Sequence, residues 1–213
     1  YDAGLRQHML GIYNYMGLGL GLSAATAFLL MQTGMSALFY SAPGQFTPIG
    51  WVAMFAPLGL LLIASFTANQ LSTQATHALY WGITALQGVG LSVLLQAFTA
   101  FSVVQILLVT AAAFGALSLY GYSTRRSLTG LGTFLFIGLI GVIIAFIANI
   151  FLQSPILQFV ASVIGVLVFA GLTAFDTQRL KDEYIAGVAG DAAAKAQVWG
   201  ALSLYLNFIN LFQ

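Results

Sequence analysis

The stretch QHMLGIYNYMGLGLGLSAATAFLLMQ, residues 7–32, opens a longer run that reaches residue 124 without an Asp, Glu, Lys or Arg. No soluble domain keeps so long an uncharged run in water without aggregating, so the run predicts a membrane protein. The composition agrees, because 5% of the residues are charged, against about 25% in an average soluble chain. Long unbroken apolar segments favour helices over a membrane barrel, whose strands alternate over about ten residues.

Turn-forming residues divide the chain into seven apolar lengths, and a helix needs about 20 residues to cross about 30 Å of hydrocarbon. Two of the helix starts carry a capping residue followed by proline, Thr47-Pro48 and Ser154-Pro155. We therefore expect an all-α polytopic membrane protein, a bundle of seven transmembrane helices in a single domain over residues 1–213. The expected helices cover approximately residues 9–32, 48–68, 78–97, 103–122, 133–152, 156–176 and 192–213.

Two connections stand out between these helices. Residues 41–47, which include Ala42-Pro43-Gly44, are expected to form a turn-rich loop, and Asp176 to Lys195 a charged connector. The first apolar run is too long for a signal peptide and is expected to be a retained helix. The chain begins at Tyr1 rather than Met and stops in an apolar run at Gln213, so we expect both ends to be trimmed.

The basic residues fall on one side of the membrane if the helices alternate. By the positive-inside rule that side is cytoplasmic, which gives a multi-pass protein with a cytoplasmic N-terminus. A net charge of +1 without a basic tract predicts no nucleic-acid partner, and the absence of cysteine excludes disulfides and thiolate metal sites. The basic residues are Arg6, Arg125, Arg126, Arg179, Lys181 and Lys195.

The last apolar segment carries a polar stripe. Ser203, Asn207, Asn210 and Gln213 recur at spacings of four, three and three residues, which places them on one helical face. Lipid would penalise that face, so this helix is expected to be central, surrounded by the others. The spacing leaves two roles open for the stripe, hydrogen bonding between helices or lining a water-filled cavity.

Asp176 is the best candidate for a functional carboxylate at membrane depth. It lies near the cytoplasmic end of the sixth helix, three residues before Arg179. In one interpretation it is an interfacial carboxylate, paired with Arg179 and open to water. In the other it is drawn into the bundle, closes a cavity with the polar stripe, and binds or releases a cation as its charge changes with pH.

We expect no enzyme. Ser23 and Ser92 could each lie within the membrane, where a serine protease pairs such a residue with a histidine on a later helix, but no histidine follows His77. His77 has no carboxylate or second histidine at ligand spacing, so no metal site is expected there. Other polar residues could extend a cavity lining, although most are expected to be structural: Gln87, Ser92, Gln96, Gln105 and Asn149.

Three segments resemble the Bax inhibitor-1 family, the transmembrane proteins with a Bax inhibitor motif. The sequence ALSLYLNFINLF, residues 201–212, is similar to the final-helix signature of that family. Residues 114–126, FGALSLYGYSTRR, and residues 169–180, around Phe175-Asp176-Thr177-Gln178, resemble it in order and spacing. The resemblance covers essentially the whole chain, and the loops are similar to those of bacterial members, which implies the inner membrane. It also implies a seven-helix bundle with the seventh helix central.

The family's best-described activity is a pH-sensitive calcium leak, in which two aspartates near the cytoplasmic end of the pore share a proton. Asp176 matches the first of them, whereas the second position is Asn207 here. Two close carboxylates cannot both ionise cheaply, and an Asp/Asn pair loses that repulsion. The resemblance therefore implies a leak that is weak or poorly gated by pH. From their spacing, Arg179, Ser203 and Asn210 are further candidates for the ion pathway, beside Asp176 and Asn207. Calcium takes six to eight oxygens, so Asp176 alone is a weak Ca²⁺ candidate.

A second functional class stays open, a regulatory protein that conducts no ion. Relatives are described as suppressors of cell death or stress in eukaryotes and as modulators of an AAA-type membrane protease in bacteria. Such a role would need a membrane partner in addition to the lipid bilayer. Nothing in the sequence identifies the surface that would bind it.

Overall fold

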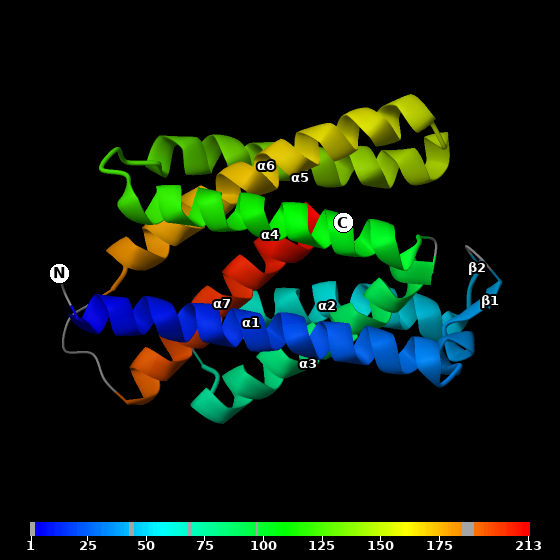
Figure 1. Ribbon diagram of the computed structural model, residues 1–213, viewed down its shortest axis with the longest axis horizontal. Coiled ribbons are helices and arrows are strands. Elements are labelled where there is room, and N and C mark those ends of the chain that lie inside the picture. The colour runs from blue at the N-terminus through cyan, green and yellow to red at the C-terminus, as the bar shows by residue number, and fades with distance from the viewer. Residues whose placement is uncertain (1–2, 43–44, 68–69, 97, 185–189) are drawn as a thin grey trace. The chain divides into compact units, whose positions relative to one another are not determined.

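The computed structural model describes residues 3–42, 45–67, 70–96, 98–184 and 190–213. Seven α-helices occur in this part of the chain, together with one short 3-10 helix and a two-stranded antiparallel hairpin (Figure 1). In chain order they are α1 (Ala3–Gln32), η1 (Met35–Leu38), β1 (Tyr40–Ala42), β2 (Gln45–Phe46), α2 (Pro48–Thr67), α3 (Thr73–Gln96), α4 (Ala100–Ser123), α5 (Thr129–Leu152), α6 (Pro155–Asp182) and α7 (Asp191–Phe212).

Five of the described helices, α1, α2, α4, α5 and α6, are long and apolar enough to cross a membrane. The expected class, an all-α polytopic membrane protein, is confirmed. α3 and α7 have the length, 24 and 22 residues, but they carry more polar side chains, among them Gln74 and His77 in α3 and Asn207 in α7. Polar content of this kind suits helices that face protein more than lipid.

Several helices extend beyond their expected ends. α6 continues to Asp182 rather than ending at Asp176, because residues 177–182 hold no helix breaker and Arg179 and Lys181 favour the negative end of the helix dipole. The prediction of a connector from Asp176 to Lys195 is therefore wrong, because α6 and α7 contain most of these residues. Residues 185–189 of that connector lie outside the described residues.

Four further helix starts lie earlier than expected, at Ala3, Thr73, Ala100 and Thr129. In α1 and α3 the expected bounds followed the apolar core, and hydropathy does not detect the more polar turns that precede it. In α3, for example, the Ser72 hydroxyl accepts a hydrogen bond from the Ala75 amide at 3.2 Å and caps the early start.

Residues 41–47 were expected to be a loop without strands, and this is wrong in part. β1 and β2 pair with Tyr40 opposite Phe46, whose ring centroids lie 5.6 Å apart; Pro43 and Gly44 lie outside the described residues. Burial raises the pKa of the Tyr40 phenol, and its hydrogen bond with Ser92 offsets part of that rise. This residue therefore keeps its proton near neutral pH and ties the hairpin to α3.

Both expected capping sites are confirmed. The Thr47 hydroxyl accepts from the Gly50 amide at 3.0 Å, and the Ser154 hydroxyl accepts from the Leu157 amide at 3.3 Å. Pro155 follows Ser154 at the first position of α6.

The chain divides into two compact units. The first unit consists of residues 1–103 and 186–202, and the second of residues 104–185 and 203–213. The expectation of a single domain over residues 1–213 stays a prediction.

In the first unit, α1 packs along α3 through buried hydroxyl groups. Tyr80, which is fully buried, donates to the Tyr15 carbonyl at 2.6 Å. Ser23 donates to the Thr84 carbonyl at 2.7 Å. Gly19 faces the Tyr80 hydroxyl so closely that a side chain there would collide with it.

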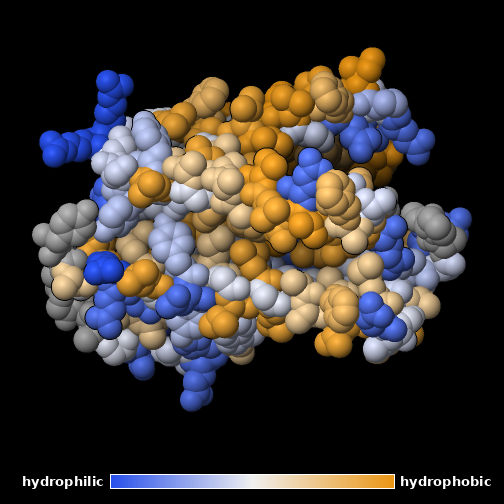
Figure 2. Space-filling model, in the orientation of Figure 1, coloured by the Kyte–Doolittle hydropathy of each residue, from blue (hydrophilic) through white to orange (hydrophobic). Residues whose placement is uncertain are grey.

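In the second unit, α5 and α6 form an antiparallel pair (Figure 1). The turn between them is held by the Asn149 side chain, which accepts from the Ser154 amide at 2.9 Å, so this residue has a structural role. The pair shares a small apolar core of Leu135, Val168 and Leu172. Its other faces are covered with exposed apolar side chains, as expected for helices surrounded by lipid (Figure 2).

The C-terminal part of α7 has the burial of a helix enclosed by protein. Every residue from Val198 to Phe212 is buried or half-buried, and Leu204 and Tyr205 are fully buried. The expected central position of the last helix in the bundle stays a prediction.

Candidate functional site

Asp176 is buried in the last two turns of α6, with 7% of its surface exposed. Its carboxylate accepts two hydrogen bonds and forms one ion pair, all with side chains of the second unit. Asn207 Nδ2 donates to Oδ2 at 2.7 Å, Ser203 Oγ donates to the same oxygen at 2.9 Å, and Arg179 Nη2 lies 3.0 Å from Oδ1. The interpretation in which Asp176 is open to water is therefore wrong, although its pairing with Arg179 is correct.

The position of Asp176 explains why it needs several donors. A carboxylate near the C-terminal end of a helix opposes the helix dipole, and burial removes the water that would otherwise solvate it. Donors aimed at both oxygens offset these two costs. We call this cluster of Asp176, Arg179, Ser203 and Asn207 the Asp176 cluster.

Two residues of the polar stripe on α7 belong to the Asp176 cluster. Ser203 and Asn207 lie one turn apart and both reach the same carboxylate oxygen. Asn210 does not join them, because its amide donates to the Leu206 carbonyl of its own helix at 2.8 Å. Ser203 and Asn207 thus bond from α7 to α6, whereas Asn210 bonds within α7.

Arg179 covers the more open side of the cluster. Its side chain is 41% exposed, and its Nη2 also donates to Ser203 Oγ at 3.3 Å. Its Nε lies 3.7 Å from Glu183 Oε1, and its guanidinium carbon lies 5.9 Å from the centre of the Phe175 ring. The guanidinium is therefore oriented by an acidic residue on each side and by an aromatic ring.

On its other faces, the end of α6 is fixed by contacts that the residue pattern does not predict. The Ser118 and Thr177 hydroxyls lie 3.0 Å apart between α4 and α6, and Thr177 also donates to the Thr173 carbonyl at 2.8 Å. Gln178, which is 7% exposed, bonds to the backbone between α4 and α5. No sequence signal marks the contacts of Gln178, because its partners are backbone groups.

The Asp176 cluster has a poor donor set for a calcium ion. Ca²⁺ takes six to eight oxygen ligands, whereas this carboxylate already accepts hydrogen bonds from an amide and a hydroxyl and is paired with a guanidinium. Among the described residues, no group of three or more His, Cys, Asp or Glu side chains could hold a metal ion. In this arrangement the Arg179 guanidinium lies beside the Asp176 carboxylate, where a bound metal ion would have to lie.

Comparison with known proteins identifies the family. A sequence profile described as "Inhibitor of apoptosis-promoting Bax1" matches residues 5–213. The chain belongs to the Bax inhibitor-1 family. The family fold has seven transmembrane helices, and the seven α-helices of the described residues match that number.

Three relatives of this Bax inhibitor-1 member come from bacteria. A Caulobacter vibrioides protein is 48% identical over 219 residues, which cover 100% of this chain and 87% of the relative. A Rickettsia prowazekii protein is 41% identical, covering 100% of this chain and 88% of the relative. Inner membrane protein YbhL of Escherichia coli K12 is 40% identical, covering 99% and 89%. The chain is accordingly a multi-pass protein of the inner membrane.

Proposed function

We propose that the chain is a cation leak of the Bax inhibitor type whose Asp176 cluster is a closed latch that responds weakly to pH. A permeating Ca²⁺ would bind the Asp176 carboxylate. Arg179 occupies the position of that Ca²⁺ while the latch is closed. The observation that carries the proposal is the 2.7 Å hydrogen bond from Asn207 to Asp176, which joins α7 to α6.

The chemistry of the donors supports weak pH dependence. A serine hydroxyl, a carboxamide and a guanidinium do not change charge near neutral pH. Glu183, whose side chain is 63% exposed, pairs with Arg179 at the edge of the cluster. An aspartate at position 207 would instead place two carboxylates at hydrogen-bond distance, and one proton would be shared between them.

Calcium flux into proteoliposomes tests the proposal. The native chain is expected to change its flux by less than about twofold between pH 6 and pH 8, because no partner of Asp176 titrates there. Asn207→Asp should raise the flux toward pH 8, since ionisation of both carboxylates would push α6 and α7 apart. Asp176→Asn should lower the flux at both pH values. A steep pH response of the native chain that persists in Asp176→Asn would overturn the proposal.

One observation favours the second candidate, a regulatory protein that conducts no ion. The Asp176 carboxylate is already paired with Arg179 and accepts hydrogen bonds from two further donors. The cluster therefore joins α6 to α7 without a bound ion. The absence of flux in the native chain, in Asn207→Asp and in Arg179→Gln would favour this candidate. Copurification of an AAA-type membrane protease from native membranes would then support a modulator role.

A further inference from the structure

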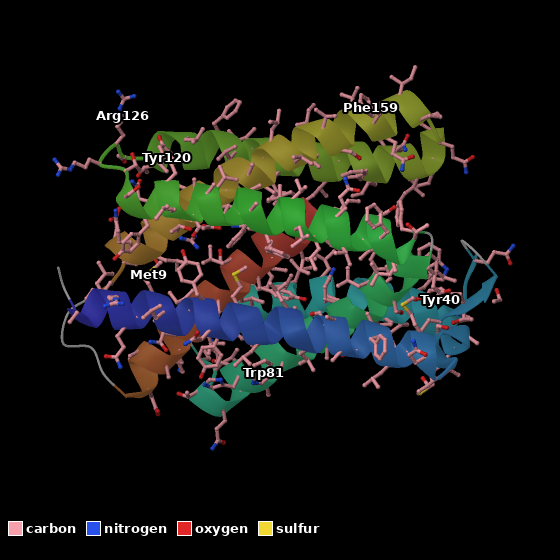
Figure 3. The ribbon with its side chains drawn as sticks, viewed as in Figure 1. Met9, Tyr40, Trp81, Tyr120, Arg126 and Phe159 are labelled. Carbon is pink, nitrogen blue, oxygen red and sulfur yellow. The ribbon has the colours of Figure 1, made fainter. Side chains whose placement is uncertain are left out.

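Two exposed arginines lie between α4 and α5. Arg125 and Arg126 are both exposed, and Figure 3 shows Arg126 directed away from the ribbon. The ion pairs found among the described residues all involve Arg179. The charge of this loop, residues 124–128, is therefore not neutralised by a described acidic side chain.

The backbone of this loop is held in place from behind by α6. Gln178 uses both ends of its buried amide, since Oε1 accepts from the Leu128 amide at 2.7 Å and Nε2 donates to the Arg126 carbonyl at 2.9 Å. Lys181 donates to the Tyr122 carbonyl at 3.0 Å and holds the end of α4. A backbone fixed in this way presents both guanidinium groups without further loss of loop entropy on binding.

The position of the loop indicates what it would meet. It joins α4 and α5, two helices that are apolar enough to span a membrane, so it lies where the hydrocarbon ends. Tyr120, half-exposed in the last turns of α4, has the position of an interfacial aromatic residue (Figure 3). Figure 2 shows hydrophilic side chains at this end of the second unit, beside the apolar surface of its helices.

We propose that Arg125 and Arg126 bind the phosphate of an anionic membrane lipid, with Gln178 as the positioning residue. Guanidinium groups match phosphate oxygens in a two-pronged geometry. The exposed hydroxyls of Ser127 and Thr129 lie beside them, 3.0 Å from each other, and add donors at the same level. The expected ligand is a lipid headgroup, because the loop borders the bilayer.

Native mass spectrometry of the full chain in detergent tests this site, with phosphatidylglycerol and phosphatidylcholine of the same acyl chains as probes. The native chain is expected to prefer phosphatidylglycerol by about 30-fold, the effect of two basic residues near an anionic surface. R125Q/R126Q should lose most of that preference, and R125K/R126K should keep part of it, because lysine retains the charge without the planar fork. Arg6→Gln is the matched control, since Arg6 is also exposed but lies on α1.

Gln178→Met separates the positioning role from charge. It keeps both arginines and the side-chain length but removes both hydrogen bonds to the loop, and we expect phosphatidylglycerol to bind several-fold more weakly. A lipid preference that is unchanged in R125Q/R126Q, or lowered equally in Arg6→Gln, would overturn the site. Displacement of the lipid by equal concentrations of inorganic phosphate would overturn its assignment to a headgroup. Native-like binding in Gln178→Met would overturn the role of Gln178.

Discussion

At the scale of single residues, the partners of Asp176 differ in how much they stabilise the fold. Asn207→Leu keeps the branched shape of the side chain but removes a donor from a buried carboxylate, so we expect a loss of about 1.5–3 kcal/mol in the free energy of unfolding. Arg179→Gln should cost less than about 1 kcal/mol, because a partly exposed ion pair is screened by water. Denaturant titration of the purified chain in mixed micelles measures both changes.

Asn210→Leu is the matched control for Asn207→Leu. Both residues lie on the polar stripe of α7, but the Asn210 amide bonds only to a carbonyl of its own helix. We expect a change within about 0.5 kcal/mol. Equal losses in the two variants would show that the bond to Asp176 is not what makes Asn207 important to stability.

Residue patterns predicted the contact between α6 and α7 in the Asp176 cluster, but they missed the contacts that Gln178 makes nearby. The spacing of Ser203 and Asn207 placed them on one face, and the rarity of charge singled out Asp176, so the α6 to α7 contact was predictable. Gln178 was not, because its partners are the backbone amide and carbonyl of residues 128 and 126, and backbone groups leave no mark in a sequence.

At the scale of elements, α4 and α6 approach each other through a glycine. A Cβ on Gly121 would collide with the Ala174 carbonyl, whereas one on Gly115 of the same helix would meet no atom within 4 Å. Gly121→Ala is expected to lower the free energy of unfolding by about 1–3 kcal/mol, because backbone must move to make room.

The matched change Gly115→Ala should be neutral or stabilising by up to about 1 kcal/mol, since alanine favours helix over glycine. Thermal unfolding of both variants in the same detergent compares them. If the two substitutions change the unfolding temperature equally, α4 and α6 do not pack closely at Gly121. Gly121 and Gly115 look alike in the sequence, so only the packing distinguishes them.

The limits of sequence-based prediction at this scale follow from what hydropathy detects. It located the apolar part of each helix, but it ended α6 at Asp176 because the following residues are polar, although Thr177, Gln178 and Lys181 make contacts that extend the helix to Asp182. The hairpin of β1 and β2 was missed for a related reason, since strands this short have no measurable alternation of polar and apolar residues.

At the scale of the whole molecule, charge and hydropathy together determine how many helices must cross. Arg6 lies in the first turns of α1, whereas Arg125 and Arg126 follow α4, so an even number of crossings must separate them if all face the cytoplasm. α1, α2 and α4 are long and apolar enough to cross a membrane, whereas α3 is long enough but less apolar. Three crossings would place Arg125 and Arg126 on the outside, so the positive-inside rule requires that α3 also crosses, despite its polar side chains.

Cysteine labelling measures this directly, because the chain has no cysteine of its own and the unmodified protein gives a blank. With α3 as a crossing, a membrane-impermeant maleimide should label Ser127→Cys only in inverted vesicles, and Ser41→Cys and Thr99→Cys only in intact spheroplasts. All three side chains are exposed, so access to the reagent depends on the side of the membrane. Labelling of Ser127→Cys in spheroplasts, with Thr99→Cys protected, would mean that α3 lies on the cytoplasmic side, and Arg125 and Arg126 would then face the outer leaflet.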